Sequence, residues 1–391
     1  MYRFLELLIS VVIVVLLFVL VGVLLPSERT VQHEVETNYP IRMVFDTLNG
    51  FRRFPDWHPL RAHDPTVRYR LAGPTDRGVG AKLLFESDNP KVGSGSYEII
   101  DSVDLERIEF AIENNARGEN KHAEVTFEQQ GKTVTIRWTY NVQYGWDLIG
   151  RYAGLYVNRT AGDDIKSGLG NFVGLLATMP RFDYSNLEVA IETIPAQHIL
   201  YTSLSADRNI TAVENAMIKG IADLKKAMAD NRLQAAGPVR LITTNFGSDK
   251  YEFDVAIPFQ VPEGARLIEP AATTGEAPAP AAAPQEAPAE GQAQVDAATT
   301  PPPAPAAPSL PLVDGLRLPE NVKQGAGYGG RVLTTQYQGH PAALPLLRDQ
   351  LRAYAATYGY PLQDRAFEEY LTDIQSTAAE DAEFKVYWPI R

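Results

Sequence analysis

The chain of 391 residues contains no cysteine, which excludes disulfide bridges, thiol catalysis and metal sites built on cysteine. It also lacks a long basic run, and its formal net charge is -12. Nucleic-acid-binding proteins usually carry a clustered basic surface, so we expect no nucleic-acid partner. A Gly-x-Ser-x-Gly elbow, a phosphate loop and a dinucleotide fingerprint are all missing from the sequence. The sequence therefore predicts no cofactor.

Histidine is scarce, but two histidines lie close together in one proline-rich segment. His58 and His63 are near Asp56 and Asp64, so the segment could hold a metal ion or perform acid–base chemistry. The spacing is not that of a helical histidine pair, which is the usual arrangement for a metal. We therefore expect a polar loop here rather than a metal site.

A long apolar run opens the chain. Residues 7–25 are broken only by Ser10 and Gly22, and as a helix they would span about 28 Å, close to the thickness of a bilayer core. A cleaved signal peptide and a buried helix are the alternatives. A signal peptide usually has a shorter apolar core and an Ala-x-Ala site, which is missing after Leu25. We expect residues 1–28 to form an uncleaved single-pass anchor in a bacterial inner membrane.

The charges that flank this run indicate a topology. The segment from Glu28 to Glu36 carries more acidic than basic residues, and positive flanks favour the cytoplasmic side. We expect the amino terminus inside and the remaining chain in the periplasm.

The region from Val31 to Pro180 has the pattern of an antiparallel sheet with one wet face. Apolar and polar residues alternate through 107–113, 123–128 and 133–140, and Gln130-Gly131 marks a short turn. A helix over 163–177 would cover the dry face, and a short helix is expected over 41–48. The helix over 163–177 would use the side chains of Ile165, Leu169, Phe172 and Leu176.

Local words in this region resemble the START-like, or SRPBCC, family, in particular its polyketide cyclase/dehydrase and lipid transport branch. They are Tyr39-Pro-Ile-Arg-Met-Val-Phe45, Phe54-Pro-Asp-Trp-His-Pro59, Gly78-Val-Gly-Ala81, Val92-Gly-Ser-Gly95 and Gly168-Leu-Gly-Asn-Phe172. The resemblance implies a helix-grip domain over residues 29–180, with a cavity between sheet and helix for an apolar small molecule. Trp57 would either line the mouth of that cavity or pack in the core.

The second half of the chain contains an internal duplication. Two segments echo each other, Asp254-Val-Ala-Ile-Pro-Phe259 and Lys385-Val-Tyr-Trp-Pro-Ile390, and each closes a strand–helix–strand unit. The two units should pack as one domain, because one unit alone leaves an apolar sheet face open. The expected elements are 191–200, 211–230 and 251–259 in the first unit, and 331–338, 344–358 and 383–390 in the second.

The two units are separated by a tract rich in alanine and proline. Residues 269–310 have almost nothing to bury, so they are predicted to be a disordered insertion. The glycine-rich segment Gly325-Ala-Gly-Tyr-Gly-Gly330 follows a linker and precedes a strand, which is the wrong context for phosphate binding. We interpret it as a hinge.

The duplicated plan resembles the GyrI-like effector-binding family, which also forms the ligand-sensing half of some AraC- and MerR-type regulators. The resemblance covers residues 187–391 and rests also on Ala366-Phe-Glu-Glu-Tyr-Leu-Thr-Asp373 and Phe384-Lys-Val-Tyr-Trp-Pro-Ile390. It implies that small, often amphipathic or cationic molecules bind in a cleft between the two halves. The family's Glu two residues before a Tyr falls here on Glu368 and Tyr370.

Aromatic residues are dense near this motif. We expect Tyr370 and Trp388 to form a pocket wall beside Glu368, with Tyr337 and Tyr387 as further ligand-binding candidates, whereas the helix-face residues Tyr354 and Tyr358 are expected in the core. A carboxylate buried alone among aromatic rings would have a raised pKa or accept tyrosine hydrogen bonds, and a bound cation would stabilise it. A solvated surface acid is the alternative for Glu368.

The sequence thus predicts an α+β protein with a transmembrane helix, a helix-grip domain and a duplicated strand–helix–strand domain. Three functions are open. The favoured one is a membrane-anchored sensor or carrier of small apolar or cationic amphipathic molecules. The others are a cyclase- or hydrolase-like enzyme acting in either cavity, and an envelope scaffold without ligands. The first is preferred because no acid–base–nucleophile constellation is visible in the sequence.

Overall fold

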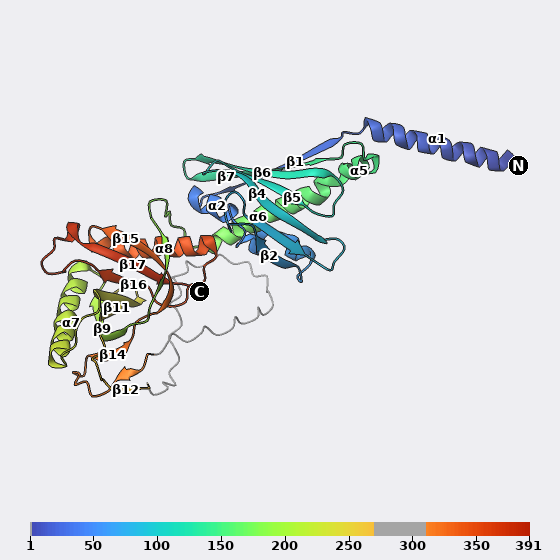
Figure 1. Ribbon diagram of the computed structural model, residues 1–391. Helices are drawn as coiled ribbons and strands as arrows, with labels where there is room; N and C mark the ends of the chain where they lie inside the picture. Colours follow the sequence, from blue (N-terminus) through green and yellow to red (C-terminus); the bar gives the residue numbers. More distant parts are fainter. Residues whose placement is uncertain (1, 270–309) are drawn as a thin grey trace. The chain divides into compact units, whose positions relative to one another are not determined.

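A computed structural model describes residues 2–269 and 310–391 of the chain (Figure 1). The protein is α+β and consists of two compact units. The first contains Met1–Ser185 and Ala356–Gly359, and the second contains Asn186–Ala355 and Tyr360–Arg391. The disordered insertion was predicted over residues 269–310, of which 270–309 lie outside the described residues.

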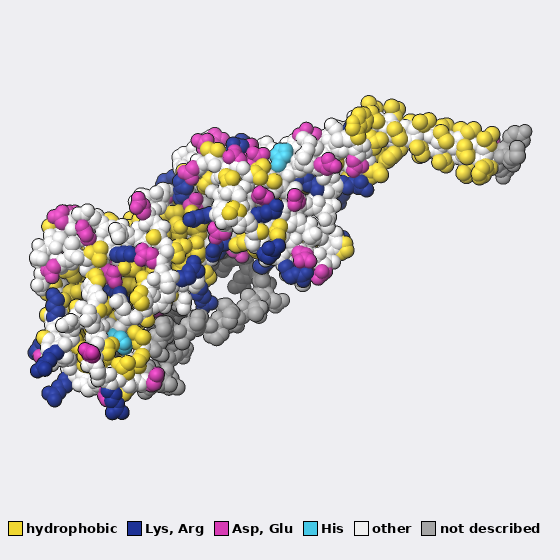
Figure 2. Space-filling model, viewed as in Figure 1, with side chains coloured by type: hydrophobic (Ala, Val, Ile, Leu, Met, Phe, Trp, Pro, Cys, Tyr) yellow, Lys and Arg dark blue, Asp and Glu magenta, His cyan; other side chains and the backbone are white. Residues whose placement is uncertain are grey.

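The first unit begins with helix α1 (Tyr2–Leu24), which contains nearly all of the predicted apolar run. It is the helix among the described residues that is long and apolar enough to cross a membrane. The side chains of this helix that are coloured by type in Figure 2 are almost all hydrophobic. Strand β1 (Glu28–Thr37) follows after three residues and pairs with β7 (Thr133–Gln143). The helix therefore leads directly into the edge of a sheet.

The seven strands of the first unit form one antiparallel sheet in the order β1-β7-β6-β5-β4-β3-β2. The three predicted alternating stretches are confirmed as β5, β6 and β7, and their apolar side chains are buried. The remaining bounds are Arg68–Ala72 for β2, Lys82–Glu86 for β3, Ser94–Val103 for β4, Arg107–Glu113 for β5 and Glu119–Gln130 for β6.

Helix α6 (Asp163–Ala177) covers the dry face as predicted, and it buries Leu169, Phe172 and Leu176. Gly168 permits a close approach, because a Cβ at this position would lie 3.3 Å from the Pro59 ring. Helix α2 (Ile41–Leu48) also has its predicted bounds. Short helices α3 (Phe54–Trp57), α4 (Leu60–His63) and α5 (Leu148–Ala153) complete the unit, with a 3-10 turn over Gly154–Tyr156 and a π-helical turn over Asn158–Gly162. The predicted polar loop around the histidines is therefore mostly helical.

The second unit contains an eight-stranded sheet in the order β14-β9-β11-β10-β16-β17-β15-β8. The duplication is visible in this order. Strand–helix–hairpin β9-α7-β10-β11 forms one half, and β15-α8-β16-β17 forms the other. The first half has β9 (His198–Asp207), α7 (Ile210–Asp230), β10 (Val239–Phe246) and β11 (Lys250–Pro258). The second half has β15 (Gly330–Gln338), α8 (Leu344–Tyr358), β16 (Phe367–Tyr370) and β17 (Glu383–Pro389).

The two halves join through β10 and β16, two strands that the sequence reading missed. The echoing segments instead form the ends of β11 and β17, where Pro258 and Pro389 are the last strand residues. The single strand predicted over 191–200 is also wrong, because β8 (Ala190–Ile194) ends before β9 begins. These two strands lie at or near opposite edges of the sheet.

Short strands close the periphery of the second unit. The predicted hinge over 325–330 is partly strand, because β14 (Lys323–Ala326) pairs with β9. Strands β12 (Leu267–Ile268) and β13 (Leu312–Val313) pair with each other. The two described ends on either side of residues 270–309 therefore lie side by side.

Helices α7 and α8 present their apolar stripes to one face of the sheet. In α7, Met217, Leu224 and Met228 are buried against strand residues such as Phe253 and Val255. In α8, the predicted stripe is buried at Leu344, Leu347, Leu351 and Tyr354, and half-buried at Tyr358. Gly359 has a φ of 68°, which only glycine adopts readily, and it ends α8 as predicted.

Candidate functional site

A buried ion pair lies between the sheet and the helices of the second unit. Strand β16 supplies Glu368, whose side chain is 1% exposed, and helix α8 supplies Arg348, whose side chain is 8% exposed. The distance from Arg348 Nη1 to Glu368 Oε1 is 3.4 Å. Arg348 also donates hydrogen bonds to Thr243 Oγ1 and, at 2.8 Å, to Tyr251 Oη. Within the described residues, neither carboxylate oxygen of Glu368 has a hydrogen-bond partner.

The electrostatics of this pair correct one premise of the sequence reading. Burial raises the pKa of Glu368, and Arg348 opposes that rise. Burial also acts to lower the pKa of Arg348, but Glu368 and Tyr251 outweigh it and the pKa is raised. The alternative of a solvated surface acid is wrong, because Glu368 is buried. The premise of a lone carboxylate is wrong as well, because Arg348 supplies a positive charge.

Tyr370 connects the buried pair to an open groove. Burial raises the pKa of its hydroxyl, and the nearby charge of Glu368 raises it further. The same side chain lines two adjoining hollows that share Lys225, Val239 and Asp373. We name these hollows together the α7 groove. The Tyr370 side chain would therefore contact a molecule in the groove, and it also lies close to the charges of Glu368 and Arg348.

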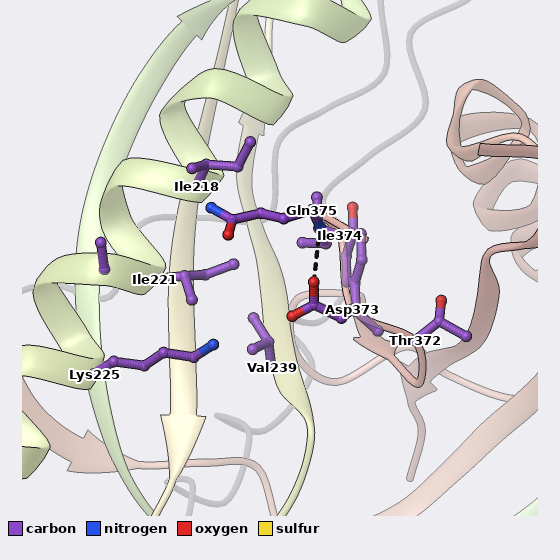
Figure 3. A pocket seen from close by; sticks show the side chains of 10 residues that line it. Ile218, Ile221, Lys225, Val239, Thr372, Asp373, Ile374 and Gln375 are labelled. Atoms are coloured by element: carbon purple, nitrogen blue, oxygen red, sulfur yellow. Dashed lines mark hydrogen bonds between the residues drawn. The ribbon is translucent and has the colours of Figure 1, made fainter. Parts of the chain in front are cut away.

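Figure 3 shows how the walls of the α7 groove are built. Ile218, Ile221 and Lys225 extend from α7 toward Val239 of β10 and toward residues 372–375, which follow β16. The apolar side chains recur at helical spacing, so one stripe of α7 borders the groove. The larger hollow has a volume of about 550 Å³, which is in the range of small-molecule sites.

Two side chains of opposite charge, Lys225 and Asp373, line the groove. Asp373 accepts hydrogen bonds from the backbone N–H groups of Gln375 at 3.0 Å and Ser376 at 3.1 Å, and from the Ser376 hydroxyl at 3.1 Å. These bonds lower the pKa of Asp373, with a smaller contribution from Lys225. No ion pair joins Lys225 to Asp373 in the described part of the chain. Both charges can therefore still meet a ligand.

The other aromatic candidates divide between the two faces of the sheet. Tyr387 lies on the sheet face opposite α7 and α8, where it stacks on Phe367 at 4.5 Å and donates a hydrogen bond to Glu369 at 2.7 Å. Adjacent strand residues point to opposite faces, so Trp388 cannot share a site wall with Tyr387. Trp388 is half-buried beneath Arg352 of α8, at 5.9 Å from ring to guanidinium, and its Nε1 has no partner among the described residues.

Tyr337 is linked to the site by one intermediate ring. It stacks on Phe384 with centroids 6.1 Å apart, and Phe384 packs edge-on against Tyr370 at 4.9 Å. Of the predicted residues, the structure thus brings Glu368 and Tyr370 together and places Tyr337 next to them. Arg348 was missed, although a charge four residues after Leu344 on an otherwise apolar helix stripe is a usable signal.

The sheet face opposite α7 and α8 has its own hollow, of about 540 Å³. Its charged side chains are largely matched within the face. Arg240 contacts Glu369 at 2.8 Å, and Arg365 contacts Asp254 at 2.9 Å. This pairing stabilises the sheet surface, so a charged ligand would gain less here than in the α7 groove.

In the first unit, Trp57 packs in the core rather than at an open surface. It is 4% exposed and lies edge-on to Trp138 and Phe172, each with centroids 5.8 Å away. The indole N–H has no partner among the described residues. The neighbouring His58 stacks on Phe54 at 4.2 Å, and burial lowers the pKa of this histidine to about 3.

The solved structures that are similar to this chain align with low TM-scores. No family model matches the chain, and no curated protein matches it. The EcmrR C-terminal domain is 8% identical over 52% of this chain and 98% of its own, with a TM-score of 0.35. A hydrolase from Listeria innocua is 9% identical over 52% of this chain and 92% of its own, with a TM-score of 0.31. Norcoclaurine synthase from Thalictrum flavum is 13% identical over 38% of this chain and 87% of its own, with a TM-score of 0.30. Scores of this size do not show a shared function.

Proposed function

We propose that the chain is a membrane-anchored binding protein for small amphipathic molecules, and that the α7 groove is its ligand site. The observation that carries this proposal is the position of Tyr370. It lines the groove and also lies beside a buried carboxylate whose oxygens have no hydrogen-bond partner among the described residues. Glu368 itself does not line the groove, so Tyr370 is the side chain through which a bound molecule would reach the buried pair.

The lining of the groove defines the class of ligand. Ile218, Ile221 and Val239 offer an apolar wall, and Lys225 and Asp373 offer one charge of each sign. A compact molecule with an apolar body and a polar or zwitterionic end fits this chemistry. A net cation gains less than the sequence suggested, because Arg348 already offsets the charge of Glu368.

The membrane part of the proposal rests on α1. The assignment of the two folds rests on the short sequence segments that resemble the START-like and GyrI-like families. We place the two units in the periplasm as START-like and GyrI-like domains attached to the inner membrane. A reporter that is active only after export, fused at Arg391, should be active in cells. Activity confined to a reporter that works in the cytoplasm would reverse this topology.

Blocking the groove tests the ligand site. Ala229 is exposed on α7 and lines the groove, whereas the exposed Lys226 on the same helix does not line it. We expect Ala229→Trp to weaken binding of the neutral dye Nile red at least ~10-fold, which corresponds to ~1.4 kcal/mol. Lys226→Trp is the matched control and should bind like the wild type. Equal affinities for all three proteins would remove the α7 groove as the ligand site.

A second dye separates the two ligand classes. Rhodamine 6G is an amphipathic cation, and Nile red is neutral. We expect the neutral dye to bind at least as tightly, because the buried carboxylate is already paired. A strong preference for the cation that disappears in Glu368→Gln would instead support the sequence-based prediction of a cation site.

A further inference from the structure

Helix α1 does not stand apart from the first unit, because a short segment packs against its carboxyl-terminal half. We call residues 145–156 the foot. Tyr152 of the foot stacks on Phe18 with centroids 4.4 Å apart, and its hydroxyl donates a hydrogen bond of 2.8 Å to the Phe18 carbonyl. Gly22 makes room for this packing, since a Cβ there would lie 3.2 Å from the Tyr152 ring.

A buried arginine fixes the foot to the end of the helix. Arg151 donates to the carbonyl oxygens of Val23 at 2.9 Å and Leu25 at 3.1 Å, and also to that of Gly145. The last carbonyls of a helix have no partner within it and carry a partial negative charge. The guanidinium therefore caps α1 and sets the position of the foot along it.

The outer surface of the foot is apolar and exposed. Trp146 is 81% exposed, Ile149 56%, Leu155 51% and Tyr156 64%. Four large side chains this open within one short segment form a patch of the kind that marks an interaction surface. Tryptophan and tyrosine are also the residues that gather where a membrane meets water.

The position of the foot along α1 identifies what covers the patch. Phe18 precedes the helix end at Leu24 by six residues, which is a distance of about 9 Å along the axis. The helix of 23 residues is about 35 Å long, against a hydrocarbon core of about 30 Å. If α1 spans the bilayer, the foot lies at the boundary between head groups and acyl chains, where interfacial segments bury about 5–10 Å.

We infer that the foot inserts into the outer boundary of the bilayer beside α1 and holds the first unit against the membrane surface. The occupant of the patch is the lipid bilayer, because the foot is attached to the last turns of the apolar helix, at Phe18 and at the carbonyls of Val23 and Leu25. This inference rests on the proposed membrane anchoring.

Tryptophan quenching by brominated lipids tests the inference in the full chain. The protein is reconstituted into phosphatidylcholine vesicles whose acyl chains carry bromine near either the carbonyl or the methyl end. The emission of Trp146 is obtained by subtracting the spectrum of Trp146→Phe. We expect bromine near the carbonyl end to reduce this emission at least about twofold, and bromine near the methyl end to act less.

Alkaline carbonate extraction of the same vesicles reports on the anchor separately. Protein that resists extraction and shows no quenching of Trp146 would overturn the foot and leave the anchor in place. Protein that is extracted but was quenched would overturn the span and support the foot. Extraction without quenching would overturn both. The triple variant Ile149→Ser, Leu155→Ser and Tyr156→Ser should lose at least half of the Trp146 quenching and still resist extraction, which distinguishes loss of the foot from misfolding.

Discussion

Replacing Arg348 by methionine should destabilise the second unit, and the loss should grow with pH. Arg348 and Glu368 are both buried, with charged atoms 3.4 Å apart. At an effective dielectric constant of about 20, this distance gives roughly 5 kcal/mol of gross attraction. Breaking such a pair by removing one partner typically costs about 3–5 kcal/mol, because the other charge stays buried and unpaired.

The pH dependence follows from the carboxyl group. Burial holds the folded pKa of Glu368 above its ordinary value, so the folded state keeps its proton longer than the unfolded chain. Stability from this group is therefore complete below the unfolded pKa and is lost as the pH rises toward the folded pKa. Removing the positive charge of Arg348 widens this window. We expect a small loss at pH 5 and the full ~3–5 kcal/mol at pH 8.

Glu368→Gln should behave differently, because an arginine cannot release its proton in this range. Arg348 keeps its hydrogen bonds to Tyr251 and Thr243, and the neutral amide removes a carboxyl group whose charging costs the folded state. We therefore expect little change at pH 5 and a small gain in stability at pH 8. The double variant should lose less than the sum of the single losses, since no unpaired charge is left.

Hydrogen exchange of the β16 amides, measured by mass spectrometry on the full chain, reads these free energies locally and does not require the two units to unfold together. Exchange rates are corrected for the intrinsic effect of pH. An equal loss for Arg348→Met at both pH values, or additive losses in the double variant, would refute the reasoning about the pair.

Three further outcomes test other parts of the molecule. Gly220→Ala should destabilise the second unit by about 1 kcal/mol, because its Cβ would lie 2.9 Å from a methyl of Leu204. Gly170→Ala has nothing within 4 Å of its Cβ and should stabilise the first unit by up to ~1 kcal/mol. Hydrogen exchange measured separately in each unit checks both. His58→Phe should flatten the acid sensitivity of the first unit between pH 6.5 and about 3, since the lowered pKa makes wild-type stability fall through that window as pH decreases; a pH series of thermal melts would show an unchanged slope if this is wrong. Shortening residues 271–309 to a Gly/Ser loop should leave the melting temperature nearly unchanged, because the paired strands on either side already lie together; a fall of many degrees would contradict it.

Much of the first unit could be predicted from its sequence, for a physical reason. Its sheet has one dry and one wet face, so strands such as β7 alternate strictly between apolar and polar residues. The covering helix α6 carries a clear apolar stripe, and its predicted bounds were correct. Binary patterns are most informative where each element is buried on a single side.

The strands of the second unit were harder to predict, because its central strands do not alternate between apolar and polar residues. Strand β10 reads Val-Arg-Leu-Ile-Thr-Thr-Asn-Phe, which does not alternate, and β16 has four residues of which three are buried. Charged residues fill interior positions there, as in the pair of Arg240 and Glu369. A pattern reading assigns such residues to the surface.

The candidate site was predicted in part. Glu368 and Tyr370 are adjacent to each other as the motif suggested, whereas Arg348 comes from a helix twenty residues earlier and was found only in three dimensions. Lys225 and Asp373 were missed for the same reason, because the groove is formed by segments far apart in the chain. Tertiary neighbours of this kind leave little trace in local patterns.

The contact between the two halves of the second unit bears on how the protein evolved and on how one half alone would behave. Only four residue pairs, from Val239 with Tyr370 to Ile242 with Phe367, join β10 to β16. They run antiparallel, and each half contributes its corresponding strand, which is the geometry of two identical subunits meeting about a two-fold axis. A gene encoding one half would therefore yield a chain with an open strand edge, and such an edge pairs with a second copy or aggregates. Fusion of the two copies converts that encounter between molecules into one within a molecule, and afterwards each half is free to acquire its own side chains.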